Sequence, residues 1–285
     1  MSLTELVKNS EYLILLNGSK VSGNGSLTFD KDGKLSVIHD INQKTNIDIL
    51  VKRGVNAKML EIFNEVDSDV CINLVLEDGS SLEYTTLRRS AHASNFNLDI
   101  SLGSGAKLDS KSVSILSGES SFNNNVLMQG EGSTSVSMDV VINASGKKQV
   151  YNYETNHKGN NSTSTMRNFV INKNGSITFM NTNGIIEKYV KGVVISQKTK
   201  GLLLDEASEI SANPILTIDE YDCNASHGAS IGAIDEDELY YLMSRGLTKE
   251  SSEKLIIGGF VSPFLSSIKD EAIKDELYKI IDKVL

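Results

Sequence analysis

Short runs of β-forming residues alternate with glycine-containing turns from about residue 10 to residue 220, and this alternation predicts an extended all-β structure. The clearest runs are Cys71–Leu76, Val136–Ile142 and Ser176–Met180. The turn signals are Asp78–Gly79, Ser104–Gly105, Gly130–Gly132, Ser145–Gly146, Asn174–Gly175 and Asn183–Gly184. The Asn-Gly pairs could close the hairpins of a β-sandwich, or they could form the corners of a solenoid whose coils stack on one another. No exact repeat is visible, so the residues alone leave both architectures open.

The apolar residues after Ile234 follow a helical period rather than a strand period. Asp235 is predicted to cap a first helix that ends at Gly246, and Thr248 to cap a second helix that Pro263 bends or ends. The apolar stripe of a third helix consists of Ile273, Leu277, Ile280, Ile281 and Val284. Such short helices cannot bury their stripes alone, so we expect them to pack on each other, on the β body or on a partner. We therefore predict a β core over residues 1–234 and a helical domain over residues 235–285.

The charge balance argues against nucleic acid and membrane surfaces as partners. Lys and Arg total 28 and Asp and Glu total 37, which gives a net charge of -9 and no basic footprint. The apolar run Tyr12–Leu16 is too short for a secretion signal or a membrane helix, and the only cysteines, Cys71 and Cys223, offer no disulfide framework. We therefore expect a cytoplasmic protein. The sequence contains no P-loop motif, so we expect this chain to bind no nucleotide of its own.

Cys223 and His227 are the candidate metal ligands. A thiolate and an imidazole both bind iron or zinc when deprotonated, and these two lie four residues apart. Because an iron–sulfur cluster usually has four protein ligands, this chain could hold one only with other groups or a partner. In the alternative interpretation, which the residue types alone favour, Cys223 is a small buried hydrophobe and His227 is a hydrogen-bonded turn residue. His157 is a weaker candidate and is expected to be a surface or hydrogen-bonded histidine.

Three segments near the C-terminus carry a resemblance to a known family. Ile215–Asp222, Ser226–Gly232 and Tyr240–Leu247 resemble, in order and spacing, the C-terminal signature of the SufB/SufD family. Gly201–Ala207 and Asn213–Pro214 also fit, so the resemblance is best over about residues 150 to 265. It implies an all-β fold, a right-handed parallel β-helix with a small C-terminal helical domain. It also implies a scaffold on which iron–sulfur clusters are built.

The resemblance also implies partners and a place for His227. In this family the helical domain docks on the ABC-type ATPase SufC, and the β-helix pairs with a second SufB or SufD subunit. His227 matches the histidine that SufD contributes near the cluster-forming interface. SufB has Glu-His-Glu where this chain has Ser226-His227-Gly228, and it has a cysteine in the region that here reads Gln197–Lys200. Both departures favour SufD. Cys223 lies two residues before the position, here Ala225, at which many SufD proteins have a cysteine.

Three hypotheses follow. The first is a SufD-like subunit, not an enzyme, that pairs with a SufB-type subunit and a SufC-type ATPase and holds iron or a transient iron–sulfur cluster at the subunit interface. The second is a minimal scaffold that forms homodimers and uses Cys223 and His227 directly. The third is an unrelated β-solenoid that binds carbohydrate or another protein, which the absence of tryptophan disfavours.

For the helical domain we expect Phe260, Phe264 and Leu265 to anchor the ATPase. Because solenoid coils stack on their neighbours, a chain that ends at Ile234 is expected to keep its β structure.

Overall fold

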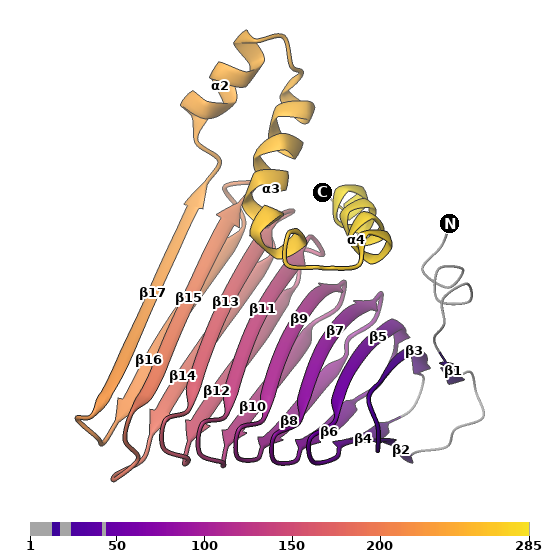
Figure 1. The fold of residues 1–285 in the computed structure, drawn as a ribbon. Coiled ribbons are helices and arrows are strands. Elements are labelled where there is room, and N and C mark those ends of the chain that lie inside the picture. Colours follow the sequence, from indigo (N-terminus) through magenta and orange to yellow (C-terminus); the bar gives the residue numbers. More distant parts are fainter. Residues whose placement is uncertain (1–12, 18–23, 42–43, 285) are drawn as a thin grey trace.

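The computed structural model describes residues 13–17, 24–41 and 44–284, and within them the chain winds into two parallel β-sheets (Figure 1). The odd-numbered strands, in this spatial order, are β1 (Leu13–Asn17), β3 (Gly33–Ile41), β5 (Asn56–Val66), β7 (Ser81–Ser90), β9 (Lys107–Leu116), β11 (Thr134–Asn143), β13 (Thr163–Asn172), β15 (Val193–Leu203) and β17 (Cys223–Ala233). The even-numbered strands are β2 (Asn24–Phe29), β4 (Thr45–Val51), β6 (Val70–Leu76), β8 (Asn95–Leu102), β10 (Ser120–Met128), β12 (Lys148–His157), β14 (Ile177–Ile186) and β16 (Glu209–Ile218). Successive strands alternate between the two sheets, and each pairs in parallel with the strand two further along. The fold is therefore the predicted β-solenoid, and the β-sandwich is excluded.

The interior of the solenoid is built from residues at equivalent positions of successive coils. Phe96, Phe122, Tyr151 and Met180 lie side by side on β8, β10, β12 and β14, and all four are buried. Strand residues point alternately inward and outward, so an apolar residue at every second position gives each coil an apolar inner face. Burying one such side chain stabilises the fold by about 1.5–3 kcal/mol.

A ladder of asparagine side chains on the eight-stranded sheet shows why no repeat is visible in the sequence. Asn97, Asn123, Asn152, Asn181 and Asn213 form a chain of amide hydrogen bonds of 2.8–2.9 Å, each linking one coil to the next. Successive members are 26, 29, 29 and 32 residues apart. The coils lengthen toward the C-terminus, so the structural repeat has no fixed period in sequence.

Most of the predicted glycine turns are confirmed, and one is wrong. Gly79, Gly105 and Gly132 have φ angles of +64° to +66° at the corners where even-numbered strands lead into odd-numbered ones. Gly184, in contrast, lies inside β14. A Cβ atom on Gly184 would come within 3.0 Å of the side-chain amide nitrogen of Gln197. Glycine is therefore used here for close packing inside a strand rather than for a turn.

Three helices follow β17, as predicted: α2 (Glu236–Ser244), α3 (Lys249–Leu265) and α4 (Glu271–Val284). Asp235 caps α2 by accepting hydrogen bonds from the backbone N–H groups of Asp237 and Glu238, at 2.8 and 3.2 Å. Thr248 caps α3 by accepting from the N–H of Ser251 at 3.1 Å. The two N-caps predicted from sequence are thus confirmed. Pro263 lies inside α3, which ends two residues later at Leu265.

α3 and α4 fold back over the outer face of the nine-stranded sheet (Figure 1). Their apolar side chains share one cluster with outward-facing strand residues; the buried members are Leu60, Ile62, Leu87, Val113, Val140, Ile142, Phe169, Ile171, Leu202, Ile257, Val261, Phe264, Leu265, Ile268, Leu277 and Ile281. Phe264 is 0% exposed, and the ring of Phe260 meets that of Phe169 edge to face at 5.6 Å. The expectation that Phe260, Phe264 and Leu265 together anchor a partner is therefore wrong, because Phe264 and Leu265 are buried within the chain and Phe260 is partly buried against Phe169.

Candidate metal site at the open end of the solenoid

Both predicted metal ligands lie on β17, the last strand of the nine-stranded sheet. β17 pairs with β15 on one edge, with Cys223 opposite Val193 and His227 opposite Gln197. In the part of the chain that the structure describes, no strand pairs with the other edge of β17 or with the outer edge of β16. The coils therefore stop here with two free strand edges.

The inner face of β17 is the uncovered end of the solenoid interior. Val193 and Gln197 on β15 are buried, at 0% and 3% exposure, and the residues beside them on β17 point in the same direction. No further coil in the described ranges covers β17, so His227 is exposed and Cys223 is only half-buried. Cys223 packs on the edge of a small apolar cluster that includes Val193 and Ile195. Both candidate ligands thus face the open end, and the interpretation of His227 as a turn residue is wrong.

The spacing along β17 separates the two candidate ligands. A strand rises by about 3.3 Å per residue, so side chains four residues apart share a face at about 13 Å from each other. Metal bonds to His nitrogen or Cys sulfur are about 2.0–2.3 Å long. Cys223 and His227 of one chain therefore cannot bind the same ion. Across the residues that the structure describes, no group of three or more His, Cys, Asp or Glu side chains could hold a metal ion.

Cys223 sits at the corner where β16 leads into β17. Its Sγ lies 3.3 Å from the backbone carbonyl oxygen of Glu220, to which the thiol donates. The carboxylate of Glu220 accepts from the backbone N–H groups of Asp222, Tyr221 and Tyr189, at 3.3, 2.9 and 3.1 Å. These hydrogen bonds lower the pKa of Glu220 below its ordinary value, and the bond from Asp222 has the largest effect. The carboxylate of Glu220 therefore fixes the backbone of the corner at which Cys223 begins β17.

Gln197 is a polar neighbour of His227 that the sequence did not single out as a site residue. Its side-chain oxygen accepts a hydrogen bond from Thr182 on the opposite sheet at 3.2 Å, while its buried Nε2 has no hydrogen-bond partner. Gln197 lies opposite His227 in the strand register. Only this register, which depends on the coil length, brings the two together. The buried N–H group is thus a donor next to the open end without a partner among the residues that the structure describes.

The buried histidines away from this end form hydrogen bonds inside the solenoid. His157 lies between the hydroxyl oxygens of Ser162 and Ser164, at 2.7 and 2.8 Å, and burial lowers its pKa to about 4. His39 contacts the carboxylate of Glu61 at 2.8 Å. The expectation of a hydrogen-bonded role for His157 is confirmed.

Large apolar side chains are exposed around the open end. Ile215 and Ile218 on β16, Tyr221 at the corner and Ile231 on β17 are each more than a third exposed. A long edge strand with unpaired N–H and C=O groups is a template for another chain, and proteins usually protect such edges. This end combines two free edges with exposed apolar side chains, as expected of a surface that a partner covers.

These features define a class of protein, a parallel β-helix with one uncovered end and a helical tail folded back on its outer face. The family model of the SufBD core domain of the SUF system for FeS cluster assembly matches residues 37–260. This chain therefore belongs to the SufBD family, which excludes the hypothesis of an unrelated solenoid.

Several curated relatives are similar over part of the chain. The iron-sulfur cluster assembly protein SufD of Bacillus subtilis is 32% identical over 166 residues, which is 58% of this chain and 38% of that protein. Iron-sulfur cluster assembly SufBD family proteins of Staphylococcus epidermidis and Staphylococcus haemolyticus are each 28% identical over 149 residues, 52% of this chain and 32% of theirs. The matched region is thus about a third of each of these relatives. No helix in the described ranges is long and apolar enough to span a membrane.

Proposed function

We propose that this chain is a SufD-like, non-catalytic subunit of a cytoplasmic scaffold that assembles iron–sulfur clusters. Its open end pairs with a SufB-type subunit, and iron or a transient cluster is held between the two. The observation that carries the proposal is the placement of His227 and Cys223 on the inner face of a strand with a free edge. An iron–sulfur cluster generally needs four protein ligands. Because Cys223 and His227 of one chain cannot bind the same ion, a partner supplies the other ligands.

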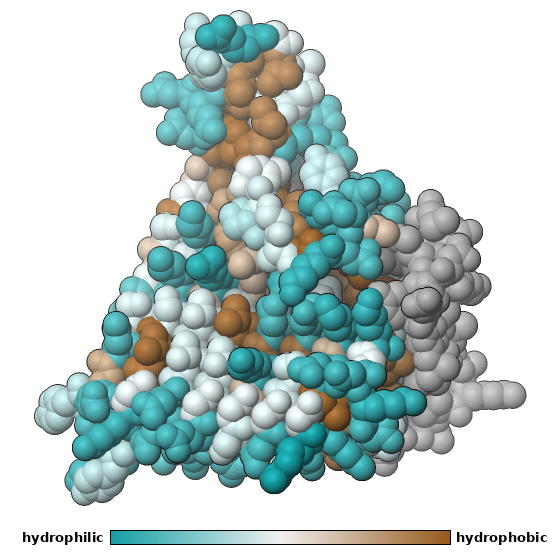
Figure 2. Space-filling model, in the orientation of Figure 1, coloured by the Kyte–Doolittle hydropathy of each residue, from teal (hydrophilic) through white to brown (hydrophobic). Residues whose placement is uncertain are grey.

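The helical tail is proposed to dock the SufC-type ATPase through α2 rather than through α3 and α4. None of the residues of α2 is buried, and Tyr240 and Tyr241 are 74% and 55% exposed. Met243 on α2 and Leu247 just after it are also exposed. Figure 2 shows hydrophobic residues at the surface of the projecting part of the tail. Aromatic side chains are enriched among the residues that dominate interface energetics. No nucleotide is bound by this chain in the proposal.

The test of the shared site is reconstitution of the complex under anaerobic conditions. This chain, a SufB-type subunit and a SufC-type ATPase are purified together, and bound iron and sulfide are measured. We expect His227→Ala to lower both, while the subunit composition stays unchanged on size exclusion. His92→Ala, which removes another exposed histidine far from the open end, serves as the matched control and should assemble clusters normally. Full assembly by an intact complex that carries His227→Ala would remove His227 from the site.

One observation favours a homodimeric scaffold as the second candidate. Cys223 and His227 lie two residues on either side of Ala225 and share one face of β17. If two copies paired antiparallel about Ala225, Cys223 of each copy would lie opposite His227 of the other, with Cβ atoms about 5 Å apart. The mass of the isolated chain and its iron content distinguish the candidates. A dimer that retains a cluster alone supports the homodimer, whereas a chain that binds no cluster without the SufB-type subunit supports the SufD-like function.

A further inference from the structure

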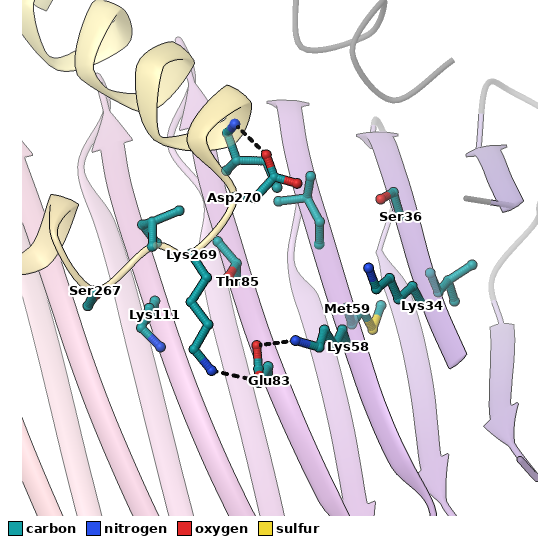
Figure 3. Close-up of a pocket in the computed structure, with 14 residues that line it drawn as sticks. Lys34, Ser36, Lys58, Met59, Glu83, Thr85, Lys111, Ser267, Lys269 and Asp270 are labelled. Carbon is teal, nitrogen blue, oxygen red and sulfur yellow. Dashed lines mark hydrogen bonds and ion pairs between the residues drawn. The ribbon is translucent and has the colours of Figure 1, made fainter. Parts of the chain in front are cut away.

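A cavity lies far from the open end, between the tail and the nine-stranded sheet. The loop from α3 to α4 lies over the outer face of the sheet, and a cavity of about 230 Å³ is lined by this loop, the start of α4 and residues of β3, β5, β7 and β9 (Figure 3). We call this cavity the tail pocket. Its 14 lining residues are Lys34, Leu35, Ser36, Lys58, Met59, Leu60, Glu83, Thr85, Lys111, Ser267, Ile268, Lys269, Asp270 and Ile273. Ligand sites commonly form where two such structural units meet.

The tail pocket gathers positive charge in an acidic chain. Its lining carries four lysines but only two carboxylates, although the whole chain has a net charge of -9. Lys58 and Lys269 share a single carboxylate (Figure 3). The Nζ atom of Lys58 lies 3.0 Å from Oε2 of Glu83, and that of Lys269 lies 3.0 Å from Oε1. Partial burial raises the pKa of Glu83, but the bonds from Lys269 and Lys58 outweigh this effect and lower the pKa below its ordinary value. Glu83 therefore carries one negative charge between two positive ones.

Two of the other charged groups at the tail pocket are each opposed by charge of the opposite sign. Asp270 directs its Oδ1 to the backbone N–H groups of Ala272 and Ile273, at 3.0 and 3.2 Å, so its charge is opposed by the positive end of α4. Lys111 is almost fully buried and contacts Asp109, which lies outside the lining, at 2.7 Å. A doubly negative group entering the tail pocket would meet the ammonium groups of Lys58 and Lys269 at the same time.

The remaining lining side chains suit a small hydroxylated molecule. Ser36, Thr85 and Ser267 place hydroxyl groups in the wall, and Leu60 and Ile268 provide apolar surface. Lysine is a common phosphate ligand because its ammonium group is a compact charge with three donors. We propose that the tail pocket binds the phosphate monoester of a small hydroxylated molecule, with Lys58 and Lys269 on the phosphate. The ligand would then contact the solenoid and the tail together.

Binding is tested by calorimetry on the full chain with glycerol 3-phosphate, inorganic phosphate and glycerol as probes. We expect glycerol 3-phosphate to bind more tightly than inorganic phosphate, and glycerol not to bind. Lys58→Gln should weaken glycerol 3-phosphate by about tenfold or more, since one charge-assisted hydrogen bond is lost. This variant leaves the contact of Lys269 with Glu83 in place. Lys107→Gln removes an exposed lysine from the same sheet outside the tail pocket and should bind as the wild type does.

A second variant should act in the opposite direction. Glu83→Gln removes the carboxylate that Lys58 and Lys269 share, so affinity for glycerol 3-phosphate should rise several-fold. Thermal unfolding with and without the probe shows whether each variant is folded, because a ligand that binds only the native state raises the melting temperature. The proposal is overturned by absence of binding to the folded wild type, by equal affinity for inorganic phosphate, or by equal weakening in Lys58→Gln and Lys107→Gln. It is also overturned if a folded Glu83→Gln variant binds no more tightly than the wild type.

Discussion

The solenoid has two apolar surfaces, of which the helical tail covers one and leaves the other exposed. On the outer face of the nine-stranded sheet, residues such as Leu87, Val140 and Phe169 are covered by α3 and α4 and are buried. At the open end, Ile218 and Ile231 are exposed beside two free strand edges. The first surface is satisfied within the chain, so it offers nothing to a partner. The comparison teaches that an apolar stripe in the sequence marks a partner site only if the rest of the fold leaves it uncovered.

Removing the tail should expose the covered surface and have the largest effect on stability. A chain ending at Ile234 loses the helices that bury the outer apolar cluster, so that face becomes a large exposed apolar patch. We expect the truncated chain to aggregate or to unfold at a much lower urea concentration than the full chain. This expectation replaces the one drawn from coil stacking alone. Light scattering and urea unfolding followed by circular dichroism measure it, and a monomeric truncated chain of unchanged stability would contradict it.

A single substitution in α3 tests the same surface. Phe264 is fully buried, so Phe264→Ala should lower the free energy of unfolding by about 3–5 kcal/mol. Leu255, on the same helix, is 56% exposed, and Leu255→Ala should change it by less than about 0.5 kcal/mol. Urea unfolding of both variants gives the two values. Similar losses in the two variants would mean that α3 does not pack on the sheet as described.

The solenoid interior makes stability depend on pH through His157. Burial lowers its pKa from 6.5 to about 4, so the native state binds this proton less readily than the unfolded chain. The stability that depends on neutral His157 is complete above pH 6.5. It falls by up to about 3 kcal/mol as the pH falls toward 4. Asp139 acts in the opposite sense, because burial raises its pKa to about 6. The prediction is therefore read from the difference between the wild type and His157→Gln at each pH.

Urea unfolding between pH 7 and pH 4 measures that difference. The wild type should lose stability relative to His157→Gln as the pH falls, while the exposed control His92→Gln should follow the wild type. Parallel pH curves for the wild type and His157→Gln would contradict the lowered pKa.

Local signals predicted much of the fold. The caps Asp235 and Thr248 depend on one helical turn, and the glycine corners such as Gly105 depend on one residue with positive φ. Gly184 was misread because its neighbour Gln197 belongs to the next coil. Choosing the solenoid over the sandwich required the family resemblance, because the lengthening coils hide their repeat.

The sequence predicted which residues belong to the candidate site but not how they are arranged in space. His227 and Cys223 are on one face of one strand, yet a helix would have brought residues four apart together, whereas a strand separates them. Gln197 lies beside His227 only because of the strand register between β15 and β17. The apolar stripe of α3 gave no sign of whether a sheet or a partner covers it. Such long-range contacts are set by the whole stack of coils.

The smallest effect on stability is expected on α2, where the effect on binding should be large. Tyr240 and Tyr241 contribute no buried side chain to the fold, so replacing both by Ala should change the free energy of unfolding by less than about 0.5 kcal/mol. If α2 docks the ATPase, the double variant should no longer co-purify with it. Tyr278→Ala, which removes an exposed tyrosine from α4, is the matched control and should bind normally. Undiminished binding by the double variant would place the docking surface elsewhere, and loss of binding in both variants would point to the tail as a whole rather than to α2.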